Sequence, residues 1–204
     1  MNMATPEIAQ QVSAANQKVM DDLSCRLIKA LLTQTKLPLR QVANHAGLAN
    51  PRALNRETQR LFNSTAANLR AKHADNDELA KDPLFGESIT VELPVQGPYD
   101  LGWVFDYLAA RALEGIETVK DHHYQRRVSP AGASPVYVHV YAQKRALHTR
   151  LPLSCSSAQS WLARVVRLFD LGVDSCVIDR ALKKAPVLGA SVAAAPGLRV
   201  PGAW

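Results

Sequence analysis

The sequence predicts an α+β fold in which an all-helical N-terminal part precedes an antiparallel sheet that packs with two helices. Apolar residues recur every three or four positions in the first part of the chain, which is the period of a helix buried on one face. After residue 88, short stretches alternate apolar and polar residues, as half-buried strands do. Stretches of helical period interrupt these strands, so we expect two helices on one face of the sheet.

The N-terminal part is expected to begin with one long amphipathic helix. Polar residues separate its apolar positions almost without exception. Pro38 ends or interrupts the helix, because proline disfavours helical geometry in the residue before it. The apolar positions that define the buried face are Ile8, Val12, Ala15, Val19, Leu23, Leu27 and Leu31.

Two shorter helices are expected next. Residues 40–46 have the length of a short helix, and Gly47 suits the left-handed turn that closes it. Asn50 and Pro51 then begin a second helix, because asparagine caps exposed amides and proline fits the first helical position. This helix is expected to run to about Phe62.

A further helix and a linker complete the N-terminal part. Asn63 can take the turn, and Ser64 or Thr65 can cap a helix that runs through Lys72. Acidic residues with Pro83 and Gly86 then fill a stretch that is typical of an interdomain linker. The expected organisation is a helical domain at 8–74, a linker at 75–88 and an α+β domain at 89–204.

The α+β domain is expected to contain several short strands. Clear alternation marks residues 89–95 and 136–141, and shorter alternations surround Tyr124 and Leu147. One helix is expected after Asp100, a good N-cap, and another around residues 161–169. The Ala/Pro/Gly-rich stretch from Ala185 is expected to be loosely structured. Aromatic residues at helical spacing, Tyr99, Trp103 and Trp161, are expected in the core.

Composition and charge narrow the class of protein. With 47% hydrophobic residues the chain is an ordinary globular protein, and no apolar run reaches the roughly 18 residues of a membrane span. No charged-then-apolar leader begins it. Cys25, Cys155 and Cys176 form no CxxC clip or dense disulfide framework, which suits the cytoplasm. The net charge of +6 favours an anionic partner.

Basic residues concentrate in the predicted helical part. Between Lys36 and Lys72 there are seven lysines and arginines against a single acid, Glu57. Three of the arginines lie at i, i+4 and i+8 of the helix that begins at Pro51, so they share one face. A second helix of this kind enters the major groove of DNA in helix-turn-helix proteins. The candidate contact residues are Arg40, Asn50, Arg52, Asn55, Arg56, Gln59 and Arg60.

These residues carry a resemblance to a known family. The segment LLTQTKLPLRQVANHAGLANPRALNRETQRLFNSTAANLR, with the helix before it from Ala14, resembles the second helix-turn-helix of AraC/XylS-type regulators. The resemblance implies binding to double-stranded DNA. Two positions depart from the family pattern: Thr58 replaces a large aromatic residue, and Asn63 replaces glycine. We expect Thr58 to lose packing and to bury an unpaired hydroxyl, at about 1 to 3 kcal/mol.

The second half resembles another family. The blocks ELPVQGPYDLGWVFDYLAARALEGIETV, YQRRV, RVVRLFDLGVD and PGLRVPGAW occur in the order found in the N-terminal domain of DNA-3-methyladenine glycosylase II. That family flips alkylated bases out of the duplex and excises them. The resemblance places its catalytic aspartate in a helix-hairpin-helix domain that follows the last block. The chain ends at Trp204, so we expect no catalytic residue here, and a separate catalytic domain as a possible partner.

The functional hypothesis is a DNA-binding protein of the alkylation-damage response without glycosidic activity of its own. Two alternatives stay open: a portion of a base-excision-repair glycosylase whose catalytic domain is lost or separate, and a degenerate remnant. No cofactor, metal or membrane partner is expected. His122 and His123 point to opposite faces of a strand, and His139 and His148 on neighbouring strands lack a third ligand. Arg126 and Arg127 either touch phosphate or are simply solvated.

Overall fold

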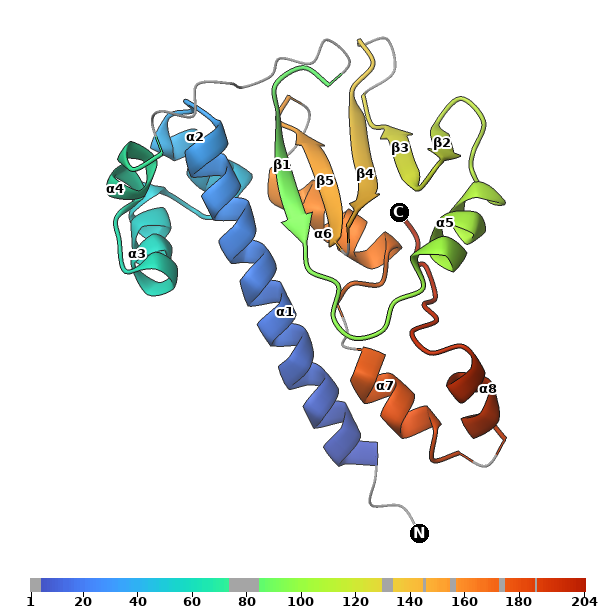
Figure 1. Ribbon diagram of the computed structural model, residues 1–204. Helices are drawn as coiled ribbons and strands as arrows, with labels where there is room; N and C mark the ends of the chain where they lie inside the picture. Colours follow the sequence, from blue (N-terminus) through green and yellow to red (C-terminus); the bar gives the residue numbers. More distant parts are fainter. Residues whose placement is uncertain are drawn as a thin grey trace.

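The computed structural model describes residues 5–73, 85–129, 134–144, 146–154, 157–172, 175–185 and 187–204, with side chains from Gln17 onward. The chain begins with α1 (Thr5–Gln34), which lies along one edge of a sheet (Figure 1). The predicted long helix is confirmed and extends by one turn at its C-terminal end. Its apolar face is buried wherever side chains are described, at Val19, Leu23, Leu27 and Leu31. The side chains of Ile8, Val12 and Ala15 lie outside the described residues.

Three short helices pack beside the C-terminal end of α1. They are α2 (Leu39–His45), α3 (Pro51–Phe62) and α4 (Ala66–Ala71). The predicted turns and caps are confirmed. Gly47 and Asn63 adopt left-handed backbone, with φ of 72° and 49°, and Thr65 caps α4 by accepting a hydrogen bond from the Asn68 amide at 3.2 Å. Local sequence therefore sets where each helix begins and ends.

The second half forms one five-stranded antiparallel sheet in the order β1-β5-β4-β3-β2. The predicted strands are confirmed, and the first begins at Ser88. Between β2 and β3, Asp121 and His122 both have positive φ, as a two-residue hairpin turn of type I′ requires. The strands are β1 (Ser88–Leu93), β2 (Glu117–Lys120), β3 (His123–Arg127), β4 (Tyr137–Gln143) and β5 (Ala146–Pro152).

One face of this sheet is covered by helices. Helix α6 (Ala158–Leu168) lies behind the sheet in Figure 1 and packs on β5, while α5 (Leu101–Ala109) packs beside β2. These are the two expected helices. Asp100 caps α5 as predicted, accepting a hydrogen bond from the Trp103 amide at 2.9 Å. Inward-facing side chains such as Tyr124, Val140 and Leu151 are buried beneath them.

The chain then continues through α7 (Ser175–Leu182) and α8 (Gly189–Ala194), two helices that the sequence analysis did not expect. Helix α8 presents no buried residue. In the described part of the α6–α7 connection, Leu171 is buried. Cys176 on α7 is exposed and Cys25 on α1 is half-buried. No described helix is long and apolar enough to cross a membrane.

The end of the chain is firmly packed, so the prediction of a loose stretch from Ala185 is wrong for residues 197–204. Gly197, at φ 76°, passes so close to Pro98 that a Cβ atom would lie 2.3 Å from its backbone. Gly202 donates its amide to the Arg167 carbonyl at 3.2 Å. Trp204 then lies with its ring centroid 6.3 Å from that of Trp161. The two glycines permit backbone contacts that any side chain would prevent.

The aromatic residues that were expected in the core lie there. Trp161 is buried, and Tyr99 and Trp103 are partly buried against the same core. The Tyr99 hydroxyl donates to the Phe169 carbonyl at 2.6 Å, and burial raises the pKa of this phenol well above its ordinary value. Tyr99 therefore has a structural role.

Helix α1 joins the helical part to the sheet. The Gln34 side chain hydrogen-bonds both the carbonyl and the amide of Thr90 in β1, each at 2.8 Å. Arg26 on α1 reaches Glu92 at 3.0 Å. Most of the predicted linker, residues 75–84, lies outside the described residues. The described contacts show that α1 completes the edge of the sheet beside β1.

Candidate nucleic-acid interface

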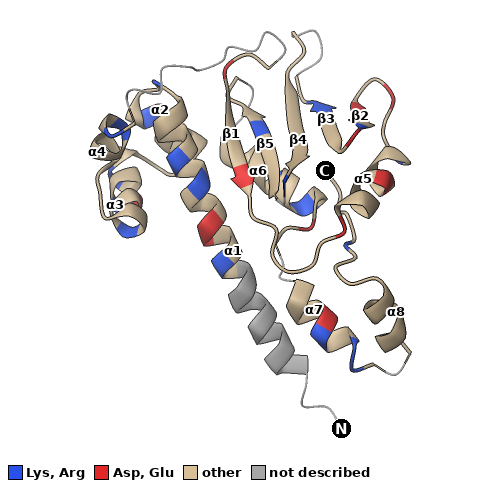
Figure 2. Ribbon diagram, viewed as in Figure 1, with Lys and Arg blue, Asp and Glu red and all other residues tan. Residues whose placement is uncertain are grey.

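Helix α3 has one polar, arginine-bearing face and one packed face. Arg52, Arg56 and Arg60 are all exposed, whereas Leu54 and Thr58 on the opposite face are fully buried. In Figure 2 the Lys and Arg positions of α3 are blue on its ribbon. The structure thus brings the three predicted arginines onto one accessible surface, which we call the α3 arginine face.

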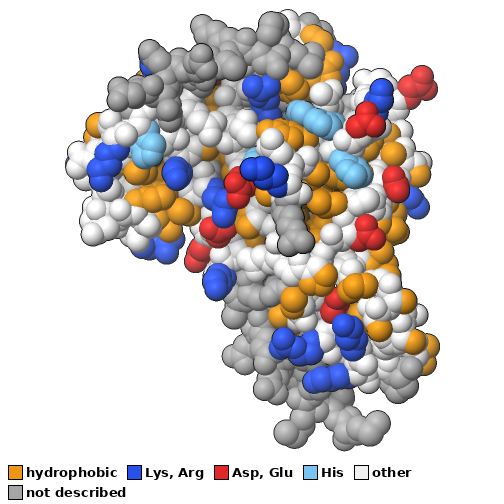
Figure 3. All heavy atoms as spheres, in the orientation of Figure 1, with side chains coloured by type: hydrophobic (Ala, Val, Ile, Leu, Met, Phe, Trp, Pro, Cys, Tyr) orange, Lys and Arg blue, Asp and Glu red, His pale blue; other side chains and the backbone are white. Residues whose placement is uncertain are grey.

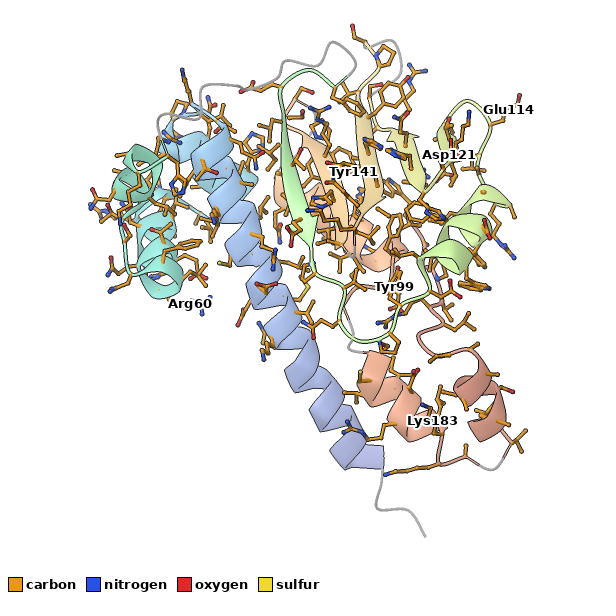
Figure 4. The ribbon with its side chains drawn as sticks, in the orientation of Figure 1. Arg60, Tyr99, Glu114, Asp121, Tyr141 and Lys183 are labelled. Atoms are coloured by element: carbon orange, nitrogen blue, oxygen red, sulfur yellow. The ribbon has the colours of Figure 1, made fainter. Side chains whose placement is uncertain are left out.

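Arg60 differs from the other two arginines of this face. Its Nε atom donates to both carboxylate oxygens of Glu57 at 3.1 Å, and Figure 4 shows it at the end of α3 far from the sheet. The hydrogen bonds and the charge of Glu57 raise the pKa of Arg60. Glu57 is the single acid that the sequence places in this basic stretch. Arg60 must therefore exchange Glu57 for a phosphate before it can contact DNA.

The predicted amide side chains already have structural partners. Asn50 caps α3, since its Oδ1 atom accepts a hydrogen bond from the Ala53 amide at 2.9 Å. The Asn55 Oδ1 atom accepts from the Ala66 amide at 3.0 Å and so ties α3 to the start of α4. Gln59 donates to the Asn63 side chain at 3.0 Å. All three are exposed, but reading a base with these groups requires that the oxygens or the donor be released.

Thr58 is buried as expected, but its hydroxyl is not unpaired. The Oγ1 atom donates to the Asn55 carbonyl one turn earlier, at 3.0 Å. A threonine in a helix can satisfy its hydroxyl in this way without a partner on another helix. The expected penalty for an unpaired hydroxyl is therefore wrong, because the helix itself provides the acceptor. Arg40, the remaining predicted contact, is exposed in the first turn of α2.

Arg70 on α4 is a partly buried cation that no sequence pattern indicated. The Nε and Nη2 atoms of Arg70 on α4 are buried without a hydrogen-bond partner in the described structure, and burial lowers the pKa of this guanidinium. Burial likewise lowers the pKa of His45 at the end of α2. No pattern in the sequence distinguishes Arg70 from a solvated arginine, because its burial depends on how α4 packs against α1.

Arg126, considered as a phosphate contact, is instead part of the packed structure. It forms an ion pair with Glu117 and lies 4.9 Å above the ring of Trp204. Burial alone would raise the pKa of Glu117, but hydrogen bonds from Tyr124, the Leu113 amide and Arg126 outweigh it and lower the pKa. Arg127, which is next in the chain, is exposed and donates to Ser129.

The histidines of the sheet domain contact neighbouring rings. His122 lies in the turn with its ring centroid 5.4 Å from that of Phe105, whereas His123 faces the other side of the sheet. His123 meets His139, with Nδ1 and Nε2 2.9 Å apart, and the ring of Tyr141 lies between His139 and His148. In the part of the chain that the structure describes, no group of three or more His, Cys, Asp or Glu residues is arranged to hold a metal ion.

A second basic site lies between α1 and the sheet. Arg26, Lys29 and Gln34 from α1 face Thr90 and Glu92 from β1 and His148 from β5 across a groove of about 360 Å³. Its positive side chains precede its histidine by more than a hundred residues in the chain. The pairing of β1 with β5 and the packing of α1 on β1 bring them together, so no local motif in the sequence predicts the groove.

Comparison with known proteins identifies the family of the second half. The AlkA N-terminal domain matches residues 90–204, more than half of the chain. The match begins at Thr90, the third residue of β1. It includes the rest of the sheet, α5 to α8 and the packed C-terminal segment.

Two relatives extend the comparison. A probable bifunctional transcriptional activator/DNA repair enzyme AlkA from Mycobacterium tuberculosis (strain H37Rv) is 32% identical over 176 residues, which is 85% of this chain and 34% of the relative. DNA-3-methyladenine glycosylase 2 from Escherichia coli (strain K12) is 37% identical over 109 residues, which is 52% of this chain and 36% of the relative. This chain therefore spans about a third of the length of these relatives.

Proposed function

The chain belongs to the AlkA N-terminal domain family, and on that basis we propose that it is a DNA-binding protein of the alkylation-damage response. In this proposal residues 8–74 are an AraC-type helix-turn-helix unit, 75–88 a linker and 89–204 the non-catalytic glycosylase domain. Its partner is double-stranded DNA in the cytoplasm. The name of the M. tuberculosis relative, which joins transcriptional activation to DNA repair and matches 85% of this chain, supports the combination.

The α3 arginine face is the observation that carries the proposal. Arg52 and Arg56 are exposed on a capped helix whose other side is anchored in the core. A guanidinium presented in this way binds phosphate or the O6 and N7 atoms of guanine in the major groove. We assign direct contacts to Arg52 and Arg56, and a contact to Arg60 once Glu57 is displaced. Arg40 lies in α2, and the first helix of a helix-turn-helix unit crosses the DNA backbone.

The amide side chains have a supporting role in this proposal. Asn50 and Asn55 hold the ends of α3 and α4 through their oxygens, which leaves their amide hydrogens as donors. Gln59 stands between the arginines and donates to Asn63. We propose that these residues position the arginines first and contact DNA second, because a change that breaks a cap also moves the helix.

The proposal is tested by titrating a labelled duplex with the chain and with the Arg56→Ala variant. We expect Arg56→Ala to weaken duplex binding about tenfold, the usual loss for one such contact. Arg180→Ala on α7 is the matched control, because it removes the same charge from an exposed helix far from α3. We expect it to bind as the parent chain does.

The salt dependence provides an independent readout. Three arginine contacts to phosphate give a slope of about −2.7 for log affinity against log salt, and Arg56→Ala is expected to make that slope shallower by about one. Equal affinity for parent and Arg56→Ala, or equal losses in Arg56→Ala and Arg180→Ala, would contradict the assignment of α3.

A second candidate function is a share in base excision. The E. coli relative, named as a glycosylase, matches the sheet domain, and the packed segment 197–204 gives that domain a fixed end. In this alternative the chain binds or supports a separate catalytic domain. We expect the purified chain to release no 3-methyladenine from alkylated DNA. Greater release on mixing the chain with a separate glycosylase catalytic domain than with that catalytic domain alone would favour the alternative over the DNA-binding proposal.

A further inference from the structure

The sheet face opposite α6 has a row of side chains that crosses all five strands. Register pairs Lys120 with His123, His123 with Tyr141, Tyr141 with His148, and His148 with Glu92. Since paired residues point to the same side of a sheet, these five side chains line up on the face opposite α6. Figure 4 shows Tyr141 near the middle of this face.

The rings of this row stack on one another. The centroids of His123 and Tyr141 lie 5.7 Å apart at an interplanar angle of 12°, and those of Tyr141 and His148 lie 5.3 Å apart at 18°. Each inner ring face is therefore covered by the next ring. His148 is the last ring of the row on the side of β1, where its register partner is Glu92.

His148 lines the groove between α1 and the sheet. Across the groove are the exposed ammonium of Lys29 and the guanidinium of Arg26. Arg26 is paired with Asp22 at 2.9 Å and with Glu92 at 3.0 Å, so its charge is already engaged, and the exposed ammonium of Lys29 is the cation that an incoming anion meets. Figure 3 shows histidine side chains on this side of the sheet, with basic side chains over α1 beside them.

We propose that this groove binds a single unpaired nucleotide of DNA, with its base stacked on His148 and its phosphate beside Lys29. A flat ring face next to an ammonium suits a ligand that joins a planar ring to an anion, and stacking on aromatic side chains beside positive charge is the general mode of single-strand binding. A groove of about 360 Å³ lies at the small end of ligand sites, which suits one nucleotide.

This site is separate from the duplex contact assigned to α3. The α3 arginine face projects from the helical part, whereas the groove is formed by the central turns of α1 with β1 and β5. An unpaired nucleotide is the form in which a damaged base becomes accessible to repair. The inference holds whether or not α3 reads duplex DNA.

The test measures binding of a labelled oligothymidylate of about twelve nucleotides by fluorescence anisotropy. We expect His148→Ala to weaken binding about tenfold, the typical loss of one stacked base. His148→Phe is expected to retain most of the affinity because it keeps a ring in the same place. Lys29→Gln is expected to weaken binding and to make the salt dependence shallower by about one half to one.

His123→Ala is the matched control, since it removes the same kind of ring from the opposite end of the stack. It is expected to leave oligothymidylate binding unchanged, as is Arg180→Ala on α7. No effect of His148→Ala, or an equal effect of His123→Ala, would overturn the inference. Loss of oligothymidylate binding in His148→Ala with retained duplex binding supports two separate sites.

Competition identifies the ligand chemistry. Thymidine monophosphate is expected to displace the oligonucleotide at lower concentration than inorganic phosphate does, because only the nucleotide has a ring to stack. Equal competition by the two would show a plain anion site and would overturn the nucleotide assignment. Failure of thymidine monophosphate alongside tight oligonucleotide binding would place the contact outside the groove and overturn it as well.

Discussion

Two groups of arginines in this protein have opposite surroundings. Arg52 and Arg56 on α3 are exposed to solvent, whereas Arg126 and Arg199 are enclosed by the sheet domain. Arg199 is only 2% exposed, donates to the Gln96 carbonyl at 3.3 Å and lies 5.2 Å above the Tyr99 ring. Arg126 is held between Glu117 and Trp204.

The difference shows how the free energy of placing an arginine depends on its surroundings. A guanidinium removed from water loses hydration that only a carboxylate, a carbonyl or a ring face can replace, and both enclosed arginines have such groups. The arginines of α3 keep their hydration and have few protein contacts to lose. Removing an enclosed arginine should therefore affect folding, and removing an exposed one should affect binding.

The largest effect is expected from Arg199→Ala. It leaves the Asp170 carboxylate, 3.8 Å from the guanidinium, without its ion pair, and burial already raises the pKa of that carboxyl. We expect the free energy of unfolding to fall by about 3 kcal/mol, measured by denaturant titration. Arg199→Lys, which keeps the charge, should recover part of the loss. An Arg199→Ala variant as stable as the parent would break the comparison.

The next effect concerns Glu117, whose pKa the structure lowers from its ordinary value of 4.5. A carboxyl with a lowered pKa adds stability above its unfolded value, and that stability disappears as pH falls through the folded value. We expect the parent chain to lose stability below about pH 4.5, and Glu117→Gln to lose about 2 to 3 kcal/mol at neutral pH. Unfolding measured from pH 7 to pH 3 should show a smaller pH dependence in the variant.

A third prediction concerns Arg52, the counterpart of Arg199 on the exposed side. Arg52→Ala is expected to change the free energy of unfolding by no more than about 0.5 kcal/mol. Duplex affinity is expected to fall about tenfold. Thermal melting and duplex titration of the same sample separate the two effects. A variant that melts early and binds normally would reverse the roles of the two groups.

The smallest effect is expected from Glu57→Gln, because Arg60 belongs to neither group. It is exposed, yet Glu57 holds it with three hydrogen bonds. Removing that charge frees Arg60 for phosphate and is expected to raise duplex affinity about twofold at low salt, with a smaller gain at high salt. Asp106→Asn on α5, which removes an exposed acid elsewhere, should leave duplex affinity unchanged.

The elements were predictable from the sequence because local chemistry sets them. Asn50 and Thr65 begin helices by accepting amide hydrogens three residues later, and Asn63 ends one by adopting left-handed backbone. The alternation of Val138 and Val140 with His139 and Tyr141 is visible in the strand and in its burial. The arginine spacing of α3 followed from the helical period alone.

Predictions that depended on distant partners failed. The C-terminal segment packs because Gly197 and Gly202 allow close backbone contact with residues about a hundred and about thirty-five positions earlier, a relation that composition does not reveal. The prediction for Thr58 failed for a local reason instead, because its own helix supplies the acceptor three residues earlier. The groove beside His148 combines residues of α1, β1 and β5, which no single stretch of sequence contains.

The sequence by itself determined the fold class, the order of the strands, the order of the helices as far as α6, and the position of the α3 arginine face. Each of these depends on hydrogen bonds and periodicities within a few residues. Only the tertiary structure decided that Arg52 and Arg56 stay in water while Arg126 and Arg199 become part of the core. The physical reason is that the hydration and partners of a charge are set by whatever the whole chain packs around it, and those neighbours come from distant parts of the sequence.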